Sequence, residues 1–397
     1  MRDFTYVKNF EKMGFGMFVH FGLYSVAGKG EWYKSLHDVS QEEYEKLIPK
    51  FKVKKTWAKD LVKTAKAAGA KYITLTARHH DGFSLFDTCG LNTYDSVHAP
   101  VGRDLVREFV DECNAQGIVP FFYHTLLDWW HKDFDDDFPS YVDYLIKSVE
   151  LLCKNYGKIG GLWFDGMWSK KDADWQEDRL YATIRKYQPE AMIINNTGLS
   201  ELGKVGHYEL DSVTFERGKP CFVDNSDRPR AGEMCQVLNS HWGYAAEDCN
   251  YKPMKEIIFN LVDCRRYNCN LLLNLGPRGN GAVSPIDREM LLMLGKWIKK
   301  NKNFIYDVRS CDIPVEGNAV LLQGKDCIYA VMEANMSADI NVQLSGASEK
   351  ITIGADIKRA IWLDNGESIE REGNTFTVKP FFYGMHLGYR VAKIWLK

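Results

Sequence analysis

Short apolar segments alternate with amphipathic segments over the first three quarters of this 397-residue chain, and this alternation limits the fold more than any other feature. Strands are expected at residues 16–21, 71–77, 118–123, 160–165, 191–195 and 270–274, and helices at 57–68, 104–116, 141–155, 175–187, 254–267 and from 285 onward. Strands that alternate with helices of this length pair in parallel. Eight such units would close into an α/β fold of the (β/α)8-like barrel type.

Two other stretches break this pattern. Residues 199–251 are rich in Gly, Pro, Asp and aromatic residues, so a long irregular and functional segment is expected there. After residue 306 the helical pattern ends, and short strands are expected at 320–322, 328–332, 340–344, 361–363 and 376–378, with a hairpin at Asn365-Gly366. We therefore expect a barrel over residues 1–305 and a C-terminal all-β sandwich over residues 306–397.

The composition is that of a folded domain, with 45% apolar and 26% charged residues and a net charge of -2. This balance gives no basic field for nucleic acid or an anionic membrane, and no apolar run approaches the roughly 18 residues of a membrane span. The first residues lack a hydrophobic signal core, so a cytoplasmic location is expected unless a leader has been removed. Ten scattered cysteines without a Cys-x-x-Cys pair predict no zinc site.

Polar and aromatic side chains gather where the expected strands end. Asp165 follows the apolar Leu-Trp-Phe, and such a charge is expected at the mouth of a sheet rather than inside it. The other strand ends and the loops after them carry His20, Glu31, Trp32, His79, His80, Tyr123 and Trp163. Hydroxyl groups need many directional donors and acceptors, and the apolar faces of sugars need flat side chains, so this set predicts a sugar-binding site.

Each residue also has a plainer interpretation. His20 could be a core histidine, the commoner role of one His in an apolar strand, Glu31 could be an ordinary loop charge, and Asp165 could be a solvated strand-end or turn residue before Gly166. His79 and His80 could suggest a metal, but adjacent strand residues point to opposite faces and chelate one ion poorly. We therefore expect no metal and no cofactor.

A resemblance supports the sugar site. The strings GFGMFVHFG (14–22), GEWY (30–33), RHHDGF (78–83) and LWFDG (162–166) resemble those of the retaining α-L-fucosidases, one family of glycoside hydrolases. The segments around Glu233 and SHWGY (240–244), and the string NLLLNLGP (270–277), are similar to later segments of that family. The likeness runs in the same order over roughly residues 4–306.

The resemblance implies an exo-acting enzyme that hydrolyses terminal α-L-fucosides of oligosaccharides or glycoconjugates through a covalent glycosyl-enzyme. It implies that Asp165 is the nucleophile and that Glu233 is the acid/base, with Glu216 and Glu247 as rivals. It also implies that the strand-end residues named above line the fucose pocket and that Arg217 supplies a donor near the nucleophile. Gly232, Asn195-Asn196-Thr197 and Asn268-Cys269 depart from the family's usual residues on the leaving-group side.

Three alternatives stay open at this stage. The site could serve a related L-galactose-type glycoside, the protein could be an inactive fucose-binding module, or the barrel could be an unrelated metal-dependent hydrolase. The sequence excludes nucleic acid and membrane as partners on charge and hydropathy, and it leaves a homo-oligomer open.

Overall fold

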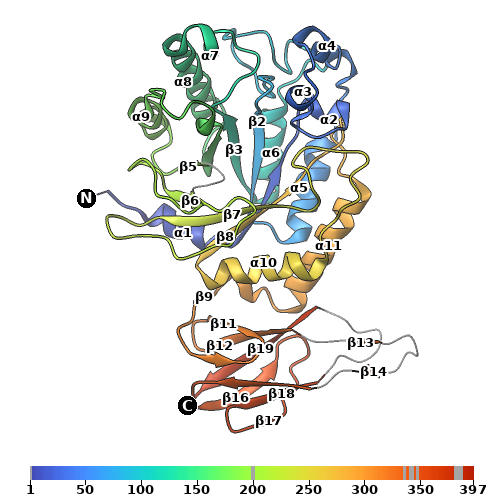
Figure 1. The fold of residues 1–397 in the computed structure, drawn as a ribbon, viewed down its shortest axis with the longest axis vertical. Coiled ribbons are helices and arrows are strands. Elements are labelled where there is room, and N and C mark those ends of the chain that lie inside the picture. The colour runs from blue at the N-terminus through green and yellow to red at the C-terminus, as the bar shows by residue number, and fades with distance from the viewer. Residues whose placement is uncertain (1, 198–201, 334–336, 339–343, 346–347, 380–387) are drawn as a thin grey trace.

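The computed structural model describes residues 2–197, 202–333, 337–338, 344–345, 348–379 and 388–397. Eight parallel strands, each paired with the next along the chain, close into a barrel in which β8 returns to β1 (Figure 1). The strands are β1 (Phe15–Val19), β2 (Tyr72–Arg78), β3 (Val119–Thr125), β4 (Gly161–Asp165), β5 (Met192–Asn195), β6 (Ser212–Thr214), β7 (Ala231–Val237) and β8 (Cys269–Leu275). The predicted barrel is confirmed.

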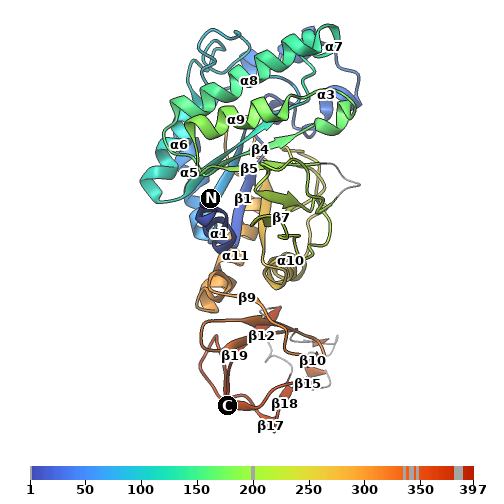
Figure 2. The ribbon, with the colours of Figure 1, turned by 90° about the vertical axis from the view of Figure 1, so that its left-hand side faces the viewer.

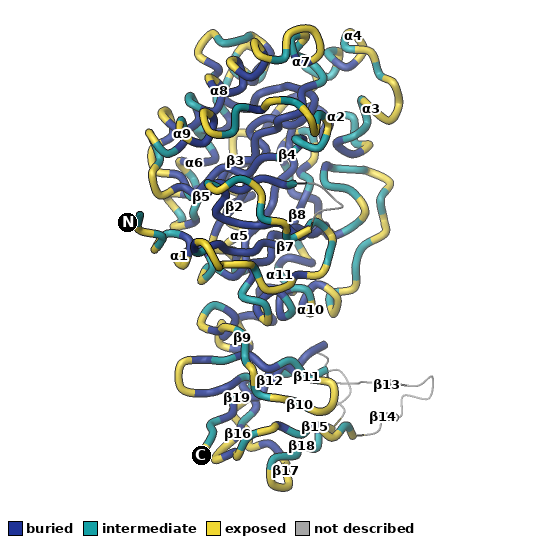
Figure 3. The backbone as a smooth tube through the Cα atoms, turned by 60° about the vertical axis from the view of Figure 1, so that its left-hand side comes forward, coloured by how far each residue is buried: buried dark blue, intermediate teal, exposed yellow. Residues whose placement is uncertain are grey.

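Helices follow six of the barrel strands and cover the outside of the barrel (Figure 2). These are α5 (Trp57–Ala68), α6 (Leu105–Gln116), α8 (Phe138–Asn155), α9 (Glu177–Tyr187), α10 (Met254–Arg266) and α11 (Pro285–Lys300). The shorter helices are α1 (Thr5–Met13), α2 (Tyr24–Ala27), α3 (Tyr33–Leu36), α4 (Gln41–Glu45) and α7 (Asp133–Asp136), with 3-10 turns at Ile48–Lys50, Met167–Lys170 and Phe304–Tyr306. Figure 3 shows the barrel strands as the buried centre of this shell.

The expected helices and six of the expected strands lie within a few residues of their observed positions. The segment expected to be irregular, 199–251, is irregular over most of its described length, but it also contains β6 and β7, which were not predicted. The strand β6 has only three residues, and β7 places Glu233 and Gln236 among its buried side chains, so neither shows a regular apolar pattern. The carboxyl ends of all eight strands, including these two, meet at one mouth of the barrel.

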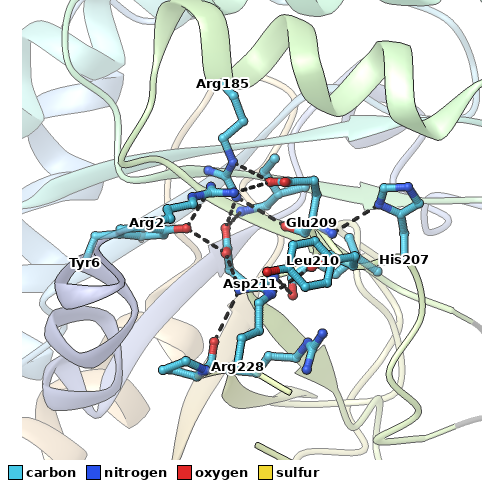
Figure 4. A network of polar contacts seen from close by, with 12 residues as sticks. Arg2, Tyr6, Arg185, His207, Glu209, Leu210, Asp211 and Arg228 are labelled. Carbon is cyan, nitrogen blue, oxygen red and sulfur yellow. Dashed lines mark hydrogen bonds and ion pairs between the residues drawn. The ribbon is translucent and has the colours of Figure 1, made fainter. Parts of the chain in front are cut away.

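The junction of β5 and β6 is the narrowest in the barrel, since only Ile194 and Ser212 pair in register there. Asp211, which is fully buried, reinforces this junction (Figure 4). Its carboxylate accepts hydrogen bonds from Arg185 Nη2 (2.5 Å), Arg228 Nη1 (3.0 Å), the Tyr6 hydroxyl (2.8 Å) and the Ile193 backbone N–H (2.9 Å). Through these hydrogen bonds, the Asp211 carboxylate connects α1, α9 and the segment before β7 to the end of the barrel where β6 begins.

The chain after Tyr306 forms antiparallel sheets. Their strands are β9 (Arg309–Ser310), β10 (Val315–Glu316), β11 (Ala319–Gln323), β12 (Ile328–Glu333), β13 (Ser337–Ala338), β14 (Leu344–Ser345), β15 (Glu349–Ile353), β16 (Ile357–Trp362), β17 (Arg371–Glu372), β18 (Thr375–Val378) and β19 (Tyr389–Leu396). A sheet in the order β16-β19-β12-β11-β9 packs on one in the order β10-β15-β18-β17 around Ile328, Ile351, Phe376 and Ile394. This confirms the predicted sandwich, whereas most of the strand expected at 340–344 lies outside the described residues.

The sandwich lies against α10 and α11 (Figure 1). The indole N–H of Trp297 on α11 donates to the carbonyl of Tyr389 at 2.9 Å, and Phe259 on α10 contacts the ring of Tyr389. The change from parallel to antiparallel pairing falls between α11 and β9. The division into domains at residues 305 and 306 remains a prediction.

Candidate active site

A cavity of about 500 Å³ opens at the carboxyl ends of the barrel strands, within the usual size range of small-molecule sites. It is lined by Phe18, His20, Trp32, His79, His80, Tyr123, Trp163, Asp165, Trp168, Lys171, Asn196, Thr197, Glu216, Cys235 and Trp242. Seven of the residues expected at the site are among them: Asp165, three histidines, two tryptophans and one tyrosine. The barrel therefore brings together groups that are far apart in the sequence.

Asp165, the last residue of β4, is surrounded by hydrogen-bond donors. Its Oδ2 accepts from the Tyr123 hydroxyl at 3.1 Å, and its Oδ1 accepts from Trp168 Nε1 at 3.1 Å and from Asn196 Nδ2 at 3.3 Å. The side chain retains 16% exposure, so it is reached from the cavity. The three donors fix the orientation of the carboxyl group, and a carboxylate held in this way can attack an electrophile in the cavity.

Glu216 lies two residues beyond β6 and is a second carboxyl group in the same cavity. Its Oε2 accepts a hydrogen bond of 2.7 Å from Asn196 Nδ2, the same nitrogen that donates to Asp165. The Thr214 hydroxyl donates to Asn196 Oδ1 at 3.0 Å and holds this amide in place. Burial, followed by the negative charge of Asp165, raises the pKa of Glu216 to about 7.

The shared amide limits how far apart the two carboxyl groups can be. The Asp165 and Glu216 oxygens both lie within hydrogen-bond distance of Asn196 Nδ2, so their separation is below about 6 Å. Paired carboxyl groups in glycosidases that retain the anomeric configuration are about 5–5.5 Å apart, whereas those of inverting enzymes are about 6.5–9.5 Å apart. The limit of about 6 Å applies to the two nearest oxygens and lies just below the range of inverting enzymes.

His20 is held as a neutral imidazole. Asn274 Nδ2 donates to the carbonyl of Trp242, so Asn274 Oδ1 is left to accept from His20 Nδ1 at 2.7 Å. This pattern assigns the proton to Nδ1 and leaves Nε2 as an acceptor. Complete burial lowers the pKa of His20 to about 3 and keeps the ring neutral.

His80 is held in the same tautomer by a different partner. The Thr125 hydroxyl donates to the carbonyl of Leu127, so it accepts from His80 Nδ1 at 2.7 Å. Burial lowers the pKa of His80 to about 4. The Nε2 of His80 then faces Asp165 Oδ2 at 3.5 Å as one acceptor facing another. Two facing acceptors of this kind favour a ligand hydroxyl group that donates a hydrogen bond to one or both of them.

His79 is buried beside His80, with ring centres 4.2 Å apart, and burial lowers its pKa well below the usual value. Its Nδ1 has no hydrogen-bond partner among the described residues, so this nitrogen is available to a polar ligand. The strand β2 ends at Arg78, so the alternation that was expected to separate His79 from His80 no longer applies. Within the described part of the chain, no group of three or more His, Cys, Asp or Glu side chains is placed to hold a metal ion.

Aromatic rings form the apolar walls of the cavity. Trp32 stacks on Trp168 with ring centres 6.0 Å apart, and Trp163 stacks on Tyr123 at 5.7 Å. Phe18 contacts the edge of Trp163 and the ring of Trp242. Flat apolar surfaces next to neutral imidazole acceptors suit a small sugar that has hydroxyl groups on one side and a hydrophobic face on the other.

Three of the expected site residues, and the rival Glu247, are not among the described residues that line the cavity. Glu31 is buried and accepts the backbone N–H of Gly243 at 2.7 Å, so it supports the loop next to Trp242. Arg217 is exposed and lies over the Trp242 ring, where it donates to the carbonyl of Ser240. Glu247 is exposed.

Glu233 is the third of these residues. It is completely buried inside the barrel and accepts hydrogen bonds from Tyr72 and Trp163. A general acid must come within hydrogen-bond distance of the leaving oxygen, and this position does not reach the cavity. Glu233 therefore lies outside the cavity that Glu216 lines, and the acid/base assignment remains a prediction.

Several cavity residues were not predicted from the sequence. Asn196 directly follows β5, so it shows the same strand-end signal that identified Asp165. Trp168 follows Asp165 by three residues in a 3-10 turn that brings its indole back to the carboxylate. Trp242, Phe18 and Cys235 lack such a signal, because an aromatic ring or a thiol at those positions reads equally well as core.

The barrel, the two carboxyl groups below about 6 Å apart and the aromatic walls define the class of protein, a glycoside hydrolase. The family model for α-L-fucosidases matches residues 3–303, and the chain belongs to that family. Both the expected resemblance and the expected enzyme class are thus confirmed. In the described part of the chain we find no helix with the length and apolarity that a membrane crossing requires.

Several named proteins are similar to this chain. The tissue α-L-fucosidase of Bos taurus is 28% identical over 357 residues, which cover 81% of this chain and 74% of that protein. The plasma α-L-fucosidase of Homo sapiens is 26% identical over 331 residues, which cover 76% and 69%. Among solved structures, α-L-fucosidase isoenzyme 1 from Paenibacillus thiaminolyticus is 29% identical with a TM-score of 0.86 and 99% coverage of both chains.

A second solved structure is an α-L-fucosidase from Bacteroides thetaiotaomicron, trapped as a covalent intermediate with 2-fluoro-fucosyl fluoride. It is 22% identical to this chain with a TM-score of 0.81. The matched region covers 100% of this chain and 97% of the Bacteroides chain. At this identity the likeness shows the fold alone.

Proposed function

We propose that this protein removes terminal α-L-fucose from oligosaccharides or glycoconjugates with retention of configuration, with Asp165 as nucleophile and Glu216 as acid/base. The observation that carries the proposal is the hydrogen bonding of both carboxyl groups to Asn196 Nδ2. The two oxygens nearest that nitrogen are at most about 6 Å apart, and this supports direct attack by Asp165 over the wider spacing with which inverting enzymes admit a water molecule.

In the first step, Asp165 attacks the anomeric carbon and forms an ester with the sugar, while Glu216 gives its proton to the leaving oxygen. Glu216 is suited to this role because burial and the charge of Asp165 raise its pKa to about 7. Formation of the ester removes the charge of Asp165 and with it one cause of the raised pKa. Glu216 then becomes a stronger acid whose carboxylate takes a proton from the water that hydrolyses the ester.

The fucose ring is held by groups that match its two sides. The acceptor nitrogens of His20 and His80 and the free Nδ1 of His79 suit the three free hydroxyls of fucose. The indoles of Trp163 and Trp242 and the Phe18 ring suit its C5 methyl group and apolar face. A cavity of about 500 Å³ suits one terminal sugar with its aglycone at the mouth, and this is the basis for exo action.

The experiment that tests this proposal is hydrolysis of a fucosylated oligosaccharide followed by NMR. The proposal predicts that the first sugar released is α-L-fucose, which mutarotates only afterwards. Release of the β-anomer would contradict the pairing of Asp165 with Glu216. Binding of L-fucose without hydrolysis would instead support an inactive fucose-binding protein. A cytoplasmic location and a homo-oligomer remain predictions.

A further inference from the structure

Glu233 is a carboxyl group in the middle of the barrel, and its presence there needs a physical explanation. It extends from β7 and is completely buried. Its two hydrogen-bond donors, Tyr72 and Trp163, belong to a cluster of buried hydrophobic side chains that also contains Phe18, Phe121, Ile194 and Leu272. A carboxyl group in such surroundings is retained only where its oxygens are hydrogen-bonded, and both oxygens of Glu233 are.

The two donors come from two different strands of the barrel. The Tyr72 hydroxyl on β2 donates to Glu233 Oε2 at 2.5 Å, and the Trp163 indole on β4 donates to Oε1 at 2.9 Å. The chain makes room for the first contact at Gly16, where an added Cβ would lie 2.3 Å from the Tyr72 ring. A side chain at residue 16 would force Tyr72 away from Glu233, so the bridge is built into the barrel.

The second donor connects this bridge to the sugar cavity. Trp163 lines the cavity and stacks on Tyr123 with an interplanar angle of 20°. The hydroxyl of Tyr123 in turn donates to Asp165 Oδ2 at 3.1 Å. The indole N–H can only donate, so an acceptor at Glu233 Oε1 fixes which way the ring faces.

We propose that Glu233 is a positioning residue, which holds the Trp163 indole as the wall of the fucose cavity and, through Tyr123, aligns the donor on Asp165. The inference rests on the proposed function of the cavity. It explains why a carboxyl group lies at a place that substrate does not reach. The role needs an acceptor for the indole N–H and a partner for the Tyr72 hydroxyl, and it needs no proton transfer by Glu233.

Glu233→Gln and Glu233→Leu separate this role from the others. The Gln amide oxygen can still accept from Trp163, and its NH₂ can donate to the Tyr72 oxygen. We expect Glu233→Gln to lower kcat/KM on an aryl α-L-fucoside by less than about threefold. Glu233→Leu removes both acceptors, and we expect it to raise KM and the inhibition constant of L-fucose together by about tenfold.

A residue that transfers protons would behave differently. Loss of activity by about 100-fold in Glu233→Gln, with recovery in azide, would overturn the positioning role in favour of acid/base catalysis. An unchanged KM and an unchanged L-fucose constant in a folded Glu233→Leu variant would show that the bridge only stabilises the barrel. Circular dichroism and the melting temperature of each variant report its folding.

Trp163→Phe supplies a second test that does not depend on the folding of Glu233→Leu. It keeps an aromatic wall but removes the indole N–H. If Glu233 acts through the Trp163 N–H, Trp163→Phe alone should raise the L-fucose dissociation constant by about the tenfold expected of Glu233→Leu, whereas an unchanged constant would overturn the inference. Calorimetric binding of L-fucose measures this even if the wild type fails to hydrolyse fucosides, so failure of the inference and failure of the proposed function are distinguishable.

Discussion

Asp165 and Glu216 accept hydrogen bonds from one nitrogen, Asn196 Nδ2, at 3.3 and 2.7 Å. The amide separates two groups that would otherwise repel each other when both are charged, and it fixes their spacing. Thr214 holds the other end of the amide at 3.0 Å. Asn196 thus determines the geometry on which the proposed mechanism depends.

Removal of this amide is expected to affect both rate and pH dependence. The hydrogen bond from Asn196 lowers the pKa of Glu216, so Asn196→Ala should raise that pKa further above about 7 and move the basic limb of the kcat/KM profile to higher pH. We also expect kcat to fall by about 10- to 100-fold as the carboxyl groups lose their alignment. Thr214→Val is the matched control with a smaller change in the same direction. A basic limb that stays in place or moves to lower pH would contradict this account.

Glu216 is expected to set the basic limb in the wild type. Its proton is present below a pKa of about 7 and is lost as the pH rises through that value, so kcat/KM should fall about tenfold per pH unit well above it. Measurement of kcat/KM from pH 5 to pH 9 on a fucoside with an unactivated leaving group tests this. A flat profile across that range would mean that another group protonates the leaving oxygen.

Glu216→Ala tests the same residue by its chemistry. We expect kcat on unactivated fucosides to fall by about 10²- to 10⁴-fold, a much smaller effect on activated aryl fucosides, and recovery with added azide as a fucosyl azide product. Glu247→Ala is the control, since Glu247 is exposed and away from the cavity. The assignment fails if azide rescues Glu247→Ala or Glu233→Ala instead.

Asp211 is expected to govern stability rather than catalysis. Its replacement by Ala leaves Arg185 and Arg228 without their buried partner, and breaking such a pair costs about 3 kcal/mol or more of the free energy of unfolding. Glu209 is a partly exposed partner of Arg2 and Arg185. Its replacement by Ala should lower the free energy of unfolding by less than about 1 kcal/mol. Urea unfolding of both Ala variants measures the difference. Equal losses would show that the buried position of Asp211 contributes nothing special.

The sequence predicted the barrel where apolar strands are long enough to show their pattern, and it failed at β6 and β7. The strand β6 has three residues, and the buried polar residues of β7 hide the alternation. This failure also explains why the sequence favoured Glu233 over Glu216 as the proposed acid/base. Without the two strands, the sequence could not show that residue 233 points into the barrel while residue 216 follows a strand end.

The nucleophile and the histidines were easier to find, because each follows a clear apolar strand and the parallel pairing brings those ends together. The residues that hold the cavity side chains in place could not be predicted from the sequence. The tautomer of His20 depends on Asn274 and on the carbonyl of Trp242, which come from β8 and from the loop after β7. Such a relay exists only once the barrel has closed.

The most direct measurement is peptide mapping by mass spectrometry after incubation with 2-fluoro-fucosyl fluoride, which slows hydrolysis of a glycosyl ester more than its formation. The account predicts one fluorofucosyl group on the peptide that contains Asp165 and its absence in Asp165→Asn. A label on Glu216, or no label while the wild type still hydrolyses fucosides, would contradict the proposal that Asp165 is the nucleophile.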